Sequence, residues 1–342
     1  MNFLTKHIRI ISIAVFLFIV ALLLFFSQYA RETTRTFFCF DTIIDISLSG
    51  ENAEKAADEI ESVLNDMEKT YSKYRPDSVV SEFNGLATGE SLVIPDEMAD
   101  LIRFTLSVSE NTDGAFDITT SKLSDLWQIK TATAPPADSQ IENALEHTGY
   151  GKINLKDNII TKTDVNIDFG GVLKGLAADK VRTIAQKHGI SSGIVNLGGN
   201  VCLIGLKDHR SSWSVGVTNP FSPGEIYLTV GAENKSVITS GAYQRYFEYE
   251  GKSYHHILSP ETGYPADTDV ASVTVISPDG TLADALSTAI FVQGSEKGFE
   301  TANEFDVGVI IITKDGNIIS NKVNYRPYNT RDNLTLSLIF LH

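Results

Sequence analysis

Apolar and charged residues alternate with a helical period along residues 51–71. The apolar positions recur every three or four residues; they are Ala53, Ala57, Ile60, Leu64 and Met67. This spacing places them on one face, so the pattern predicts an amphipathic helix over Glu51–Tyr71. Similar periods, with capping residues, predict four more helices; these are Asp96–Glu110, a short one from a Ser139–Glu142 capping box to before Gly149, Gly175–His188 and Thr281–Val292.

Short runs rich in β-branched and aromatic residues predict strands, mostly in the second half of the chain. They are Thr42–Leu48, Gly193–Asn196, Ser214–Thr218, Ile226–Val230, Val237–Thr239, Tyr243–Glu250, Ser253–Leu258, Ala271–Ile276 and Val307–Thr313. Glu250-Gly251 has the composition of a hairpin turn. Because helices are grouped early and neighbouring strands late, we expect an α+β fold with mixed, mostly antiparallel sheets rather than a doubly wound sheet.

One uninterrupted apolar run, Ile10–Phe26 with only Ser12 polar, stands apart from this pattern. Its length corresponds to about 25 Å of helix, near the lower limit for a membrane span. We expect residues 1–35 to form an uncleaved N-terminal membrane helix, with a cleaved secretion signal as the alternative. Gln28 is too large for the candidate cleavage site. Either outcome places the rest of the chain on the extracytoplasmic side of the cell membrane.

Charge sharpens this division of the chain. The protein has 28 basic and 43 acidic residues, a net charge of −15 over 342 residues. Residues 1–35 carry a net +3, so the remainder carries −18. Such an acidic domain argues against nucleic acid as a partner, since phosphates need a basic face. The two cysteines, Cys39 and Cys202, exclude a four-thiolate metal site. Their apolar settings favour two buried free thiols, with a disulfide between them, which export would permit, as the alternative.

Two glycine-rich segments are candidates for ligand contact. Asn166–Gly175 has the pattern of a turn running into a helix, whose N-terminus favours an anion, and Lys174 adds a positive charge. Val195–Asn200 has the pattern of a strand that ends in a tight glycine turn. Taken alone, each also has a purely structural interpretation.

An aromatic hairpin over Tyr243–Leu258, which leads into Ser259–Gly263, is the third candidate. Adjacent residues on a strand face opposite sides of it, so at most one of His255 and His256 points into a site. Packing within a sheet is the alternative interpretation of this segment.

The fourth candidate is the helix segment Thr281–Thr288. Asp284 and Thr288 lie four residues apart and share a helix face. A carboxylate and a hydroxyl suit a hard cation such as Mg²⁺. Thr281 and Asp284 also match a capping box, so both interpretations of Asp284 stay open here.

In this order, the segments resemble those of the ApbE family of FAD:protein FMN transferases. The matching stretches are Phe40–Thr42, Tyr74–Ser78, Gly114–Ile118, Asp168–Gly175, Val195–Gly199, Ser240-Gly241 with Tyr243, His255–Gly263 and Leu282–Thr288. The resemblance implies a two-lobed, T-fold-like flavin transferase domain over residues 36–320, between the N-terminal segment 1–35 and a C-terminal tail over 321–342.

The resemblance also implies an Mg²⁺-dependent reaction in which a Thr or Ser hydroxyl of a partner protein takes FMN from FAD and AMP leaves. The acceptor is expected to be an exported or membrane-bound flavoprotein that carries a Thr/Ser flavinylation motif. Two alternatives are an Mg²⁺-dependent FAD pyrophosphatase that gives FMN and AMP, and a non-enzymatic flavin-binding surface protein.

Residue roles follow from the resemblance by position. The implied metal ligands are Asp284, Thr288, the carbonyl of Gly171 and Ser287, where some relatives have an acidic residue. The implied FAD contacts are Phe40, Tyr74, Ala115, Phe116, Asp117, Asp168, Lys174 and Leu258. His256 is the candidate proton acceptor near the incoming hydroxyl, and Asp284 competes with it for that role.

Overall fold

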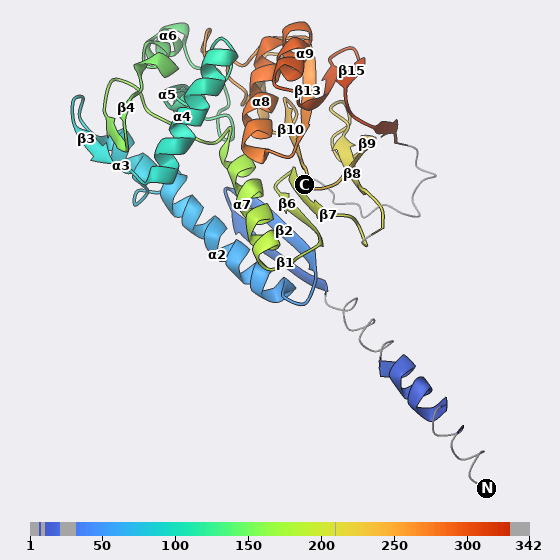
Figure 1. Cartoon of the computed structure of the whole chain (residues 1–342). Coiled ribbons are helices and arrows are strands. Elements are labelled where there is room, and N and C mark those ends of the chain that lie inside the picture. Colours follow the sequence, from blue (N-terminus) through green and yellow to red (C-terminus); the bar gives the residue numbers. More distant parts are fainter. Residues whose placement is uncertain (1–6, 8–10, 21–31, 209, 329–342) are drawn as a thin grey trace.

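The computed structural model describes residues 7, 11–20, 32–208 and 210–328, and a large antiparallel sheet organises them (Figure 1). Its eight strands lie in the order β1 (Glu32–Cys39), β2 (Thr42–Ser49), β6 (Ser192–Leu197), β7 (Asn200–Gly205), β10 (Ser236–Gly241), β13 (Val270–Ser277), β14 (Gly308–Thr313) and β15 (Ile318–Asn321). Every neighbouring pair is antiparallel. The α+β class and the predominance of antiparallel pairing are confirmed.

Both faces of this sheet are covered, which explains why several central strands are apolar without alternation. Helices α2 (Ala53–Tyr71), α7 (Leu173–Lys187) and α8 (Gly280–Gln293) share the larger core with one face. A three-stranded sheet covers the other; it contains β8 (Trp213–Thr218), β9 (Ile226–Ala232) and β16 (Tyr325–Pro327). All eight residues of β13 are buried, because neither of its faces meets water.

A second group of elements lies beside the C-terminal end of α2. It consists of α3 (Val79–Gly85), α4 (Asp96–Asn111), α5 (Ser121–Trp127), α6 (Asp138–Glu146), the single-turn η1 (Tyr150–Lys152) and a small sheet of β3 (Ser91–Val93), β5 (Ile159–Thr161) and β4 (Asn154–Lys156). Beyond α8, helix α9 (Ser295–Glu304) packs against β14 and β15. These elements carry the loops that reach the candidate site.

All five predicted helices and all nine predicted strands are present, with boundaries that differ by a few residues. The Glu250-Gly251 turn is confirmed: it joins β11 (Tyr246–Tyr249) to β12 (Lys252–His255), and both residues have positive φ angles of 49° and 76°. The predicted capping box of Ser139 and Glu142 is wrong. Helix α6 begins at Asp138, and the Gln140 side chain accepts a hydrogen bond from the Ala137 backbone N–H.

The sequence interpretation missed three helices, α3, α5 and α9, and seven strands, β1, β3, β4, β5, β7, β15 and β16. The two cysteines are buried free thiols, as predicted. In the N-terminal segment, residues 11–20 are helical and exposed. Among the described residues, no helix has the length and apolar character that a membrane span needs. The remaining parts of the predicted anchor, residues 1–6, 8–10 and 21–31, lie outside the described residues, so its role stays a prediction.

Candidate active site

Helices α7 and α8 cross with almost no space between them at Gly175. Its backbone N–H donates to Asp284 Oδ2 at 2.9 Å. A Cβ atom at this position would lie 2.7 Å from Asp284 Cβ, and even closer to the carbonyl oxygen of Gly280. Only glycine permits this approach, which brings the start of α7 onto the face of α8 that carries Asp284.

The Asp284 carboxylate is buried, with 5% of the residue exposed. Its Oδ1 atom accepts from Asn200 Nδ2 at 3.1 Å. Burial raises the pKa of Asp284, and the nearby charge of Lys174 acts in the opposite direction. Burial likewise lowers the pKa of Lys174, against the attraction of Asp284. The charge of each group therefore favours the ionised form of the other.

Asp284 does not cap its helix. The N-cap of α8 is Asp279, whose side chain accepts from the Leu282 backbone N–H at 2.8 Å. Thr281 instead donates its hydroxyl to Asp179 of α7. The capping-box interpretation of Thr281 and Asp284 is thus wrong, and Asp284 lies one turn inside the helix.

A row of hydroxyl groups continues from Asp284 along α8. Ser240 Oγ of β10 lies 2.7 Å from Ser287 Oγ and 3.5 Å from Thr288 Oγ1. The Ser287 hydroxyl also donates to the carbonyl of Asp284, so it is engaged within the helix. Gly171 adjoins Thr288, because a Cβ built on it would lie 3.7 Å from Thr288 Oγ1.

This donor set is made of oxygen atoms, as Mg²⁺ prefers. The half-buried Thr288 hydroxyl has one long contact, to Ser240, among the described residues, and the Asp284 carboxylate, with about four acceptor positions, has acceptor capacity beyond its bonds from backbone N–H groups and Asn200. The described residues contain no group of three or more His, Cys, Asp and Glu that would bind a metal by side chains alone. The residues therefore fit a hard cation held by one carboxylate, one hydroxyl and backbone oxygen, and completed by a ligand.

His256 follows β12 and is held by the backbone of Arg245. Its Nδ1 lies 3.3 Å from the Arg245 carbonyl oxygen, which only accepts, so Nδ1 carries the proton and Nε2 is the acceptor. Burial, followed by the charge of Arg245, lowers the pKa of His256 to about 3. Lys174 contributes in the same direction, which places His256 in the electrostatic range of the Asp284 pair. Its imidazole is neutral at neutral pH.

His255 faces the other way, as the strand pattern predicts. Its Nε2 lies 3.2 Å from the carbonyl oxygen of Ala266, and its ring packs edge-on against Phe291. Burial lowers the pKa of His255 to about 4. His255 is therefore a core residue, and His256 is the one of the two whose pKa the charges of Arg245 and Lys174 lower.

Arg245 also reaches the hairpin turn between β1 and β2. Its guanidinium lies 3.5 Å from Asp41 Oδ2, and Lys130 pairs with the same carboxylate. The turn residues Phe40 and Asp41 both have positive φ, and Glu68 accepts from the Phe40 backbone N–H at 3.0 Å. These contacts hold Phe40, an expected FAD contact, half-buried against the core.

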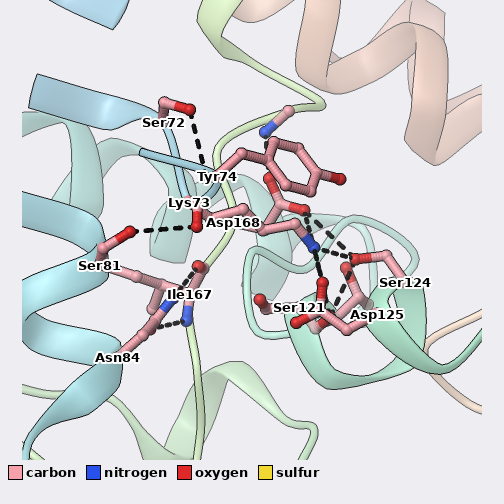
Figure 2. A network of polar contacts seen from close by, with 12 residues as sticks. Ser72, Lys73, Tyr74, Ser81, Asn84, Ser121, Ser124, Asp125, Ile167 and Asp168 are labelled. Atoms are coloured by element: carbon pink, nitrogen blue, oxygen red, sulfur yellow. Dashed lines mark hydrogen bonds and ion pairs between the residues drawn. The ribbon is translucent and has the colours of Figure 1, made fainter. Parts of the chain in front are cut away.

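Asp168 and Tyr74 lie together in a second polar network (Figure 2). Asp168 Oδ1 accepts from the Gly170 backbone N–H at 2.8 Å, and Oδ2 lies 3.0 Å from Lys73 Nζ. Lys73 Nζ also lies 5.2 Å from the centroid of the Tyr74 ring, which is 77% exposed. An exposed aromatic ring thus stands beside a carboxylate at the start of the glycine turn that leads to Gly171.

The other expected FAD contacts differ in their surroundings. Phe116 is buried and lies against Gly171, while Ala115 is half-buried against the core. Both Asp117 oxygens accept bonds from the protein, from Thr119 and from the Tyr150 backbone N–H at 2.7 Å. Asp117 therefore shapes its loop. Leu258 packs in a separate core cluster with Trp127.

Comparison with known proteins adds independent evidence. The sequence model of the ApbE family matches residues 40–311, most of the chain. This chain belongs to the ApbE family.

Individual relatives agree over most of their length. The chain is 34% identical to the FAD:protein FMN transferase of Treponema pallidum over 270 residues, which is 73% of this chain and 74% of that protein. The ApbE protein of Thermotoga maritima superposes with a TM-score of 0.79 at 34% identity, covering 85% of this chain and 97% of the other. The apo flavinyl transferase ApbE of Pseudomonas stutzeri gives 0.76 at 29% identity, covering 85% and 95%.

In this ApbE-family chain, sequence reasoning gave no role to several residues at the site. Asn200 and Ser240 lie in the candidate segments Val195–Asn200 and Ser240-Gly241, but neither side chain was predicted to have a role. Lys73 and Arg245 are adjacent to predicted aromatic positions, but a lysine or arginine beside an aromatic residue carries no signal by itself. Their contacts arise only when distant segments meet.

Proposed function

We propose that this protein transfers FMN from FAD to a Thr or Ser hydroxyl of a partner flavoprotein and releases AMP. The observation that carries the proposal is the buried Asp284 carboxylate, with Thr288 on its helix face and Lys174 beside it, within electrostatic range of the neutral His256. Membership of the ApbE family and relatives named FAD:protein FMN transferase support it.

The proposed reaction balances without a redox step. The acceptor oxygen forms a bond to the FMN phosphorus, and the bond from that phosphorus to the bridging oxygen breaks. AMP leaves with the bridging oxygen, and the proton of the acceptor hydroxyl passes to a base. The enzyme has little covalent chemistry to do, so positioning and charge neutralisation carry the catalysis.

Asp284, Thr288 and the Gly171 carbonyl would hold Mg²⁺, with Ser287 and Ser240 orienting the Thr288 hydroxyl. When bound, Mg²⁺ would neutralise charge on the pyrophosphate oxygens. Asn200 and the Gly175 N–H fix both Asp284 oxygens, so the carboxylate cannot rotate away from α7. Lys174 offers a second positive charge to the phosphates.

His256 is the proposed proton acceptor. Its Nδ1 is fixed by the Arg245 carbonyl, so Nε2 presents a lone pair at neutral pH. With a pKa of about 3 the ring is a weak base, and its task is to hold and orient the hydroxyl proton as the oxygen attacks. Asp284 suits this role less, because a carboxylate that holds a cation is a poorer base.

The proposed location is extracytoplasmic, with the N-terminal segment acting as an anchor or signal. This part rests on the apolar run Ile10–Phe26 alone. Labelling with a membrane-impermeant thiol reagent tests it. In intact spheroplasts, an engineered surface cysteine on the domain should react with the reagent.

The test of activity combines the full chain, FAD, MgCl₂ and a flavoprotein encoded beside it that carries a Thr/Ser acceptor segment. Intact-mass spectrometry should show one FMN phosphoester on the acceptor. Release of free FMN and AMP with an unmodified acceptor would support a pyrophosphatase instead. Bound but intact FAD would support a binding protein.

A further inference from the structure

The Lys73 side chain is buried beside the candidate site, with 4% exposed, although it carries a charge. Its Nζ lies 2.8 Å from Asp125 Oδ1 and 3.0 Å from Asp168 Oδ2, and it donates to Ser124 Oγ. Burial disfavours the charged form, but the two carboxylates outweigh it and raise the pKa of Lys73. A permanently charged group therefore links three segments that are distant in sequence (Figure 2).

The backbones of these segments are held by other contacts. Helix α3 lies between them: Ser81 donates its hydroxyl to the Lys73 carbonyl at 3.0 Å. Asn84 donates to the Ile167 carbonyl at 2.9 Å and accepts from the Ile167 N–H at 2.8 Å. The course of the chain at residues 73 and 167 thus does not depend on the Lys73 charge. The ammonium instead contacts the side chains of Asp168 and Tyr74. The Asp168 carboxylate also accepts from the Gly170 N–H at 2.8 Å and from Ser124 Oγ at 3.3 Å, so Lys73 shares its placement with these donors.

Both of these side chains present one side to solvent and rest on Lys73 with the other. The Tyr74 ring is 77% exposed and packs on the ammonium through a cation–π contact. The Asp168 side chain is 22% exposed and, being a carboxylate, has lone pairs left to accept from a ligand. A flat ring beside an acceptor complements a planar heteroaromatic ligand with N–H or O–H donors on its edge.

We propose that Lys73 is a positioning residue for the flavin end of the FAD substrate. It holds the Tyr74 ring where the ring can stack on the flavin, and it holds the Asp168 carboxylate where the carboxylate can accept a hydrogen bond from the flavin edge. The inference rests on the proposed function for the identity of the ligand, but not on FMN transfer, because it concerns binding alone. Preorganisation of this kind lowers the entropy lost when the ligand binds.

The test is a titration of the full chain with FAD, followed by flavin fluorescence, for wild type, Lys73→Met, Asp168→Asn and the double variant. Methionine keeps the length of the side chain and removes its charge. We expect Lys73→Met to raise the Kd for FAD about tenfold, because the groups that contact the ligand are then misplaced. We also expect the fluorescence of bound flavin to be quenched less than in the wild type. The double variant should lose less binding free energy than the sum of the two single variants, because Lys73 acts partly through Asp168 and partly through Tyr74.

Two control variants separate positioning from folding. Lys69→Met removes an exposed charge at the end of α2 that, in the described part of the chain, pairs only with Asp66, and it should leave the Kd unchanged. Asp125→Asn weakens the anchorage of Lys73 but keeps its contact with Asp168, so its effect should be smaller than that of Lys73→Met.

The proposal is overturned if Lys73→Met melts at a lower temperature but binds FAD with the wild-type Kd and quenching, or if its effect adds fully to that of Asp168→Asn. Failure of FMN transfer by the wild type, with FAD binding intact, would count against the proposed function and leave this inference standing.

Discussion

The backbone N–H of Gly175 donates to the carboxylate of Asp284 at 2.9 Å, across 109 residues of sequence. This bond exists because α7 and α8 touch at a position where no side chain fits. It fixes the candidate metal-binding carboxylate to the same helix start that carries Lys174. The chemistry of the site therefore depends on the packing of two helices, and several consequences can be measured.

Replacement of Asp284 by Asn should abolish transfer while the fold persists. Asparagine retains an oxygen that accepts from Gly175 but lacks the charge that holds a cation. We expect the rate to fall by about 100-fold or more, the usual scale for losing a group that stabilises transition-state charge. Rates normalised to folded protein check this prediction. As a matched control, Asp279→Asn at the cap of the same helix should keep both the rate and the melting temperature, because asparagine caps a helix about as well as aspartate.

Gly175→Ala tests the close helix crossing. The added Cβ would meet Asp284 Cβ at 2.7 Å, so α7 must move away from α8. We expect a loss of about 1–3 kcal/mol in the free energy of unfolding, together with reduced activity. Gly85→Ala is the control, because nothing lies within 4 Å of its added Cβ. Equal stability of both variants in urea denaturation would contradict the packing argument.

Thr288→Val should weaken metal binding with little effect on stability. Valine matches threonine in shape but has no hydroxyl, and among the described residues the Thr288 hydroxyl has only one long contact. We expect the Mg²⁺ concentration for half-maximal rate to rise about tenfold. Chelation of the metal should stop the wild-type reaction reversibly. An unchanged Mg²⁺ dependence would remove Thr288 from the ligand set.

His255 makes stability depend on pH in a predictable direction. Its pKa falls from an ordinary value of 6.5 to about 4 in the folded protein, so between these values the unfolded chain binds more protons. Stability from the neutral ring is complete above pH 6.5 and decreases as the pH falls toward 4, by up to about 1.4 kcal/mol per pH unit.

His255→Gln removes this titration. The variant should therefore lose less stability than the wild type between pH 6.5 and pH 4, as measured by urea denaturation at several pH values. Carboxylates that titrate in the same range contribute equally to both proteins, so their contribution cancels when the two unfolding free energies are subtracted. A difference in unfolding free energy that stays constant with pH would show that His255 is not buried in its neutral form.

Local patterns in the sequence identified much of the fold. Residues 53–67 have a helical period and the strands have apolar runs, because these elements bury side chains against one large sheet. Burial of this kind leaves a pattern in the spacing of neighbouring residues, so it can be predicted from the sequence. The spacing of Asp284 and Thr288 correctly placed both on one face of α8. The alternation of His255 and His256 correctly predicted that they face opposite sides.

Contacts between distant segments were not predictable in the same way. Asp284 matched a capping box because sequence spacing cannot show that Asp279 takes that position and that Gly175 lies against Asp284. Lys73 gave no signal, since its partners come from α5 and from the turn before α7. Nor could the sequence show that both oxygens of Asp117, an expected FAD contact, also accept bonds within the protein, from Thr119 and from the Tyr150 backbone N–H.

The central claim, FMN transfer from FAD to a protein hydroxyl, is tested most directly by counting products. The full chain is incubated with FAD, Mg²⁺ and the acceptor flavoprotein, and AMP, free FMN and acceptor-bound FMN are quantified together. We predict one AMP for each FMN on the acceptor and no AMP above background in the Asp284→Asn reaction. AMP matched by free FMN, with the acceptor unmodified, would contradict the account.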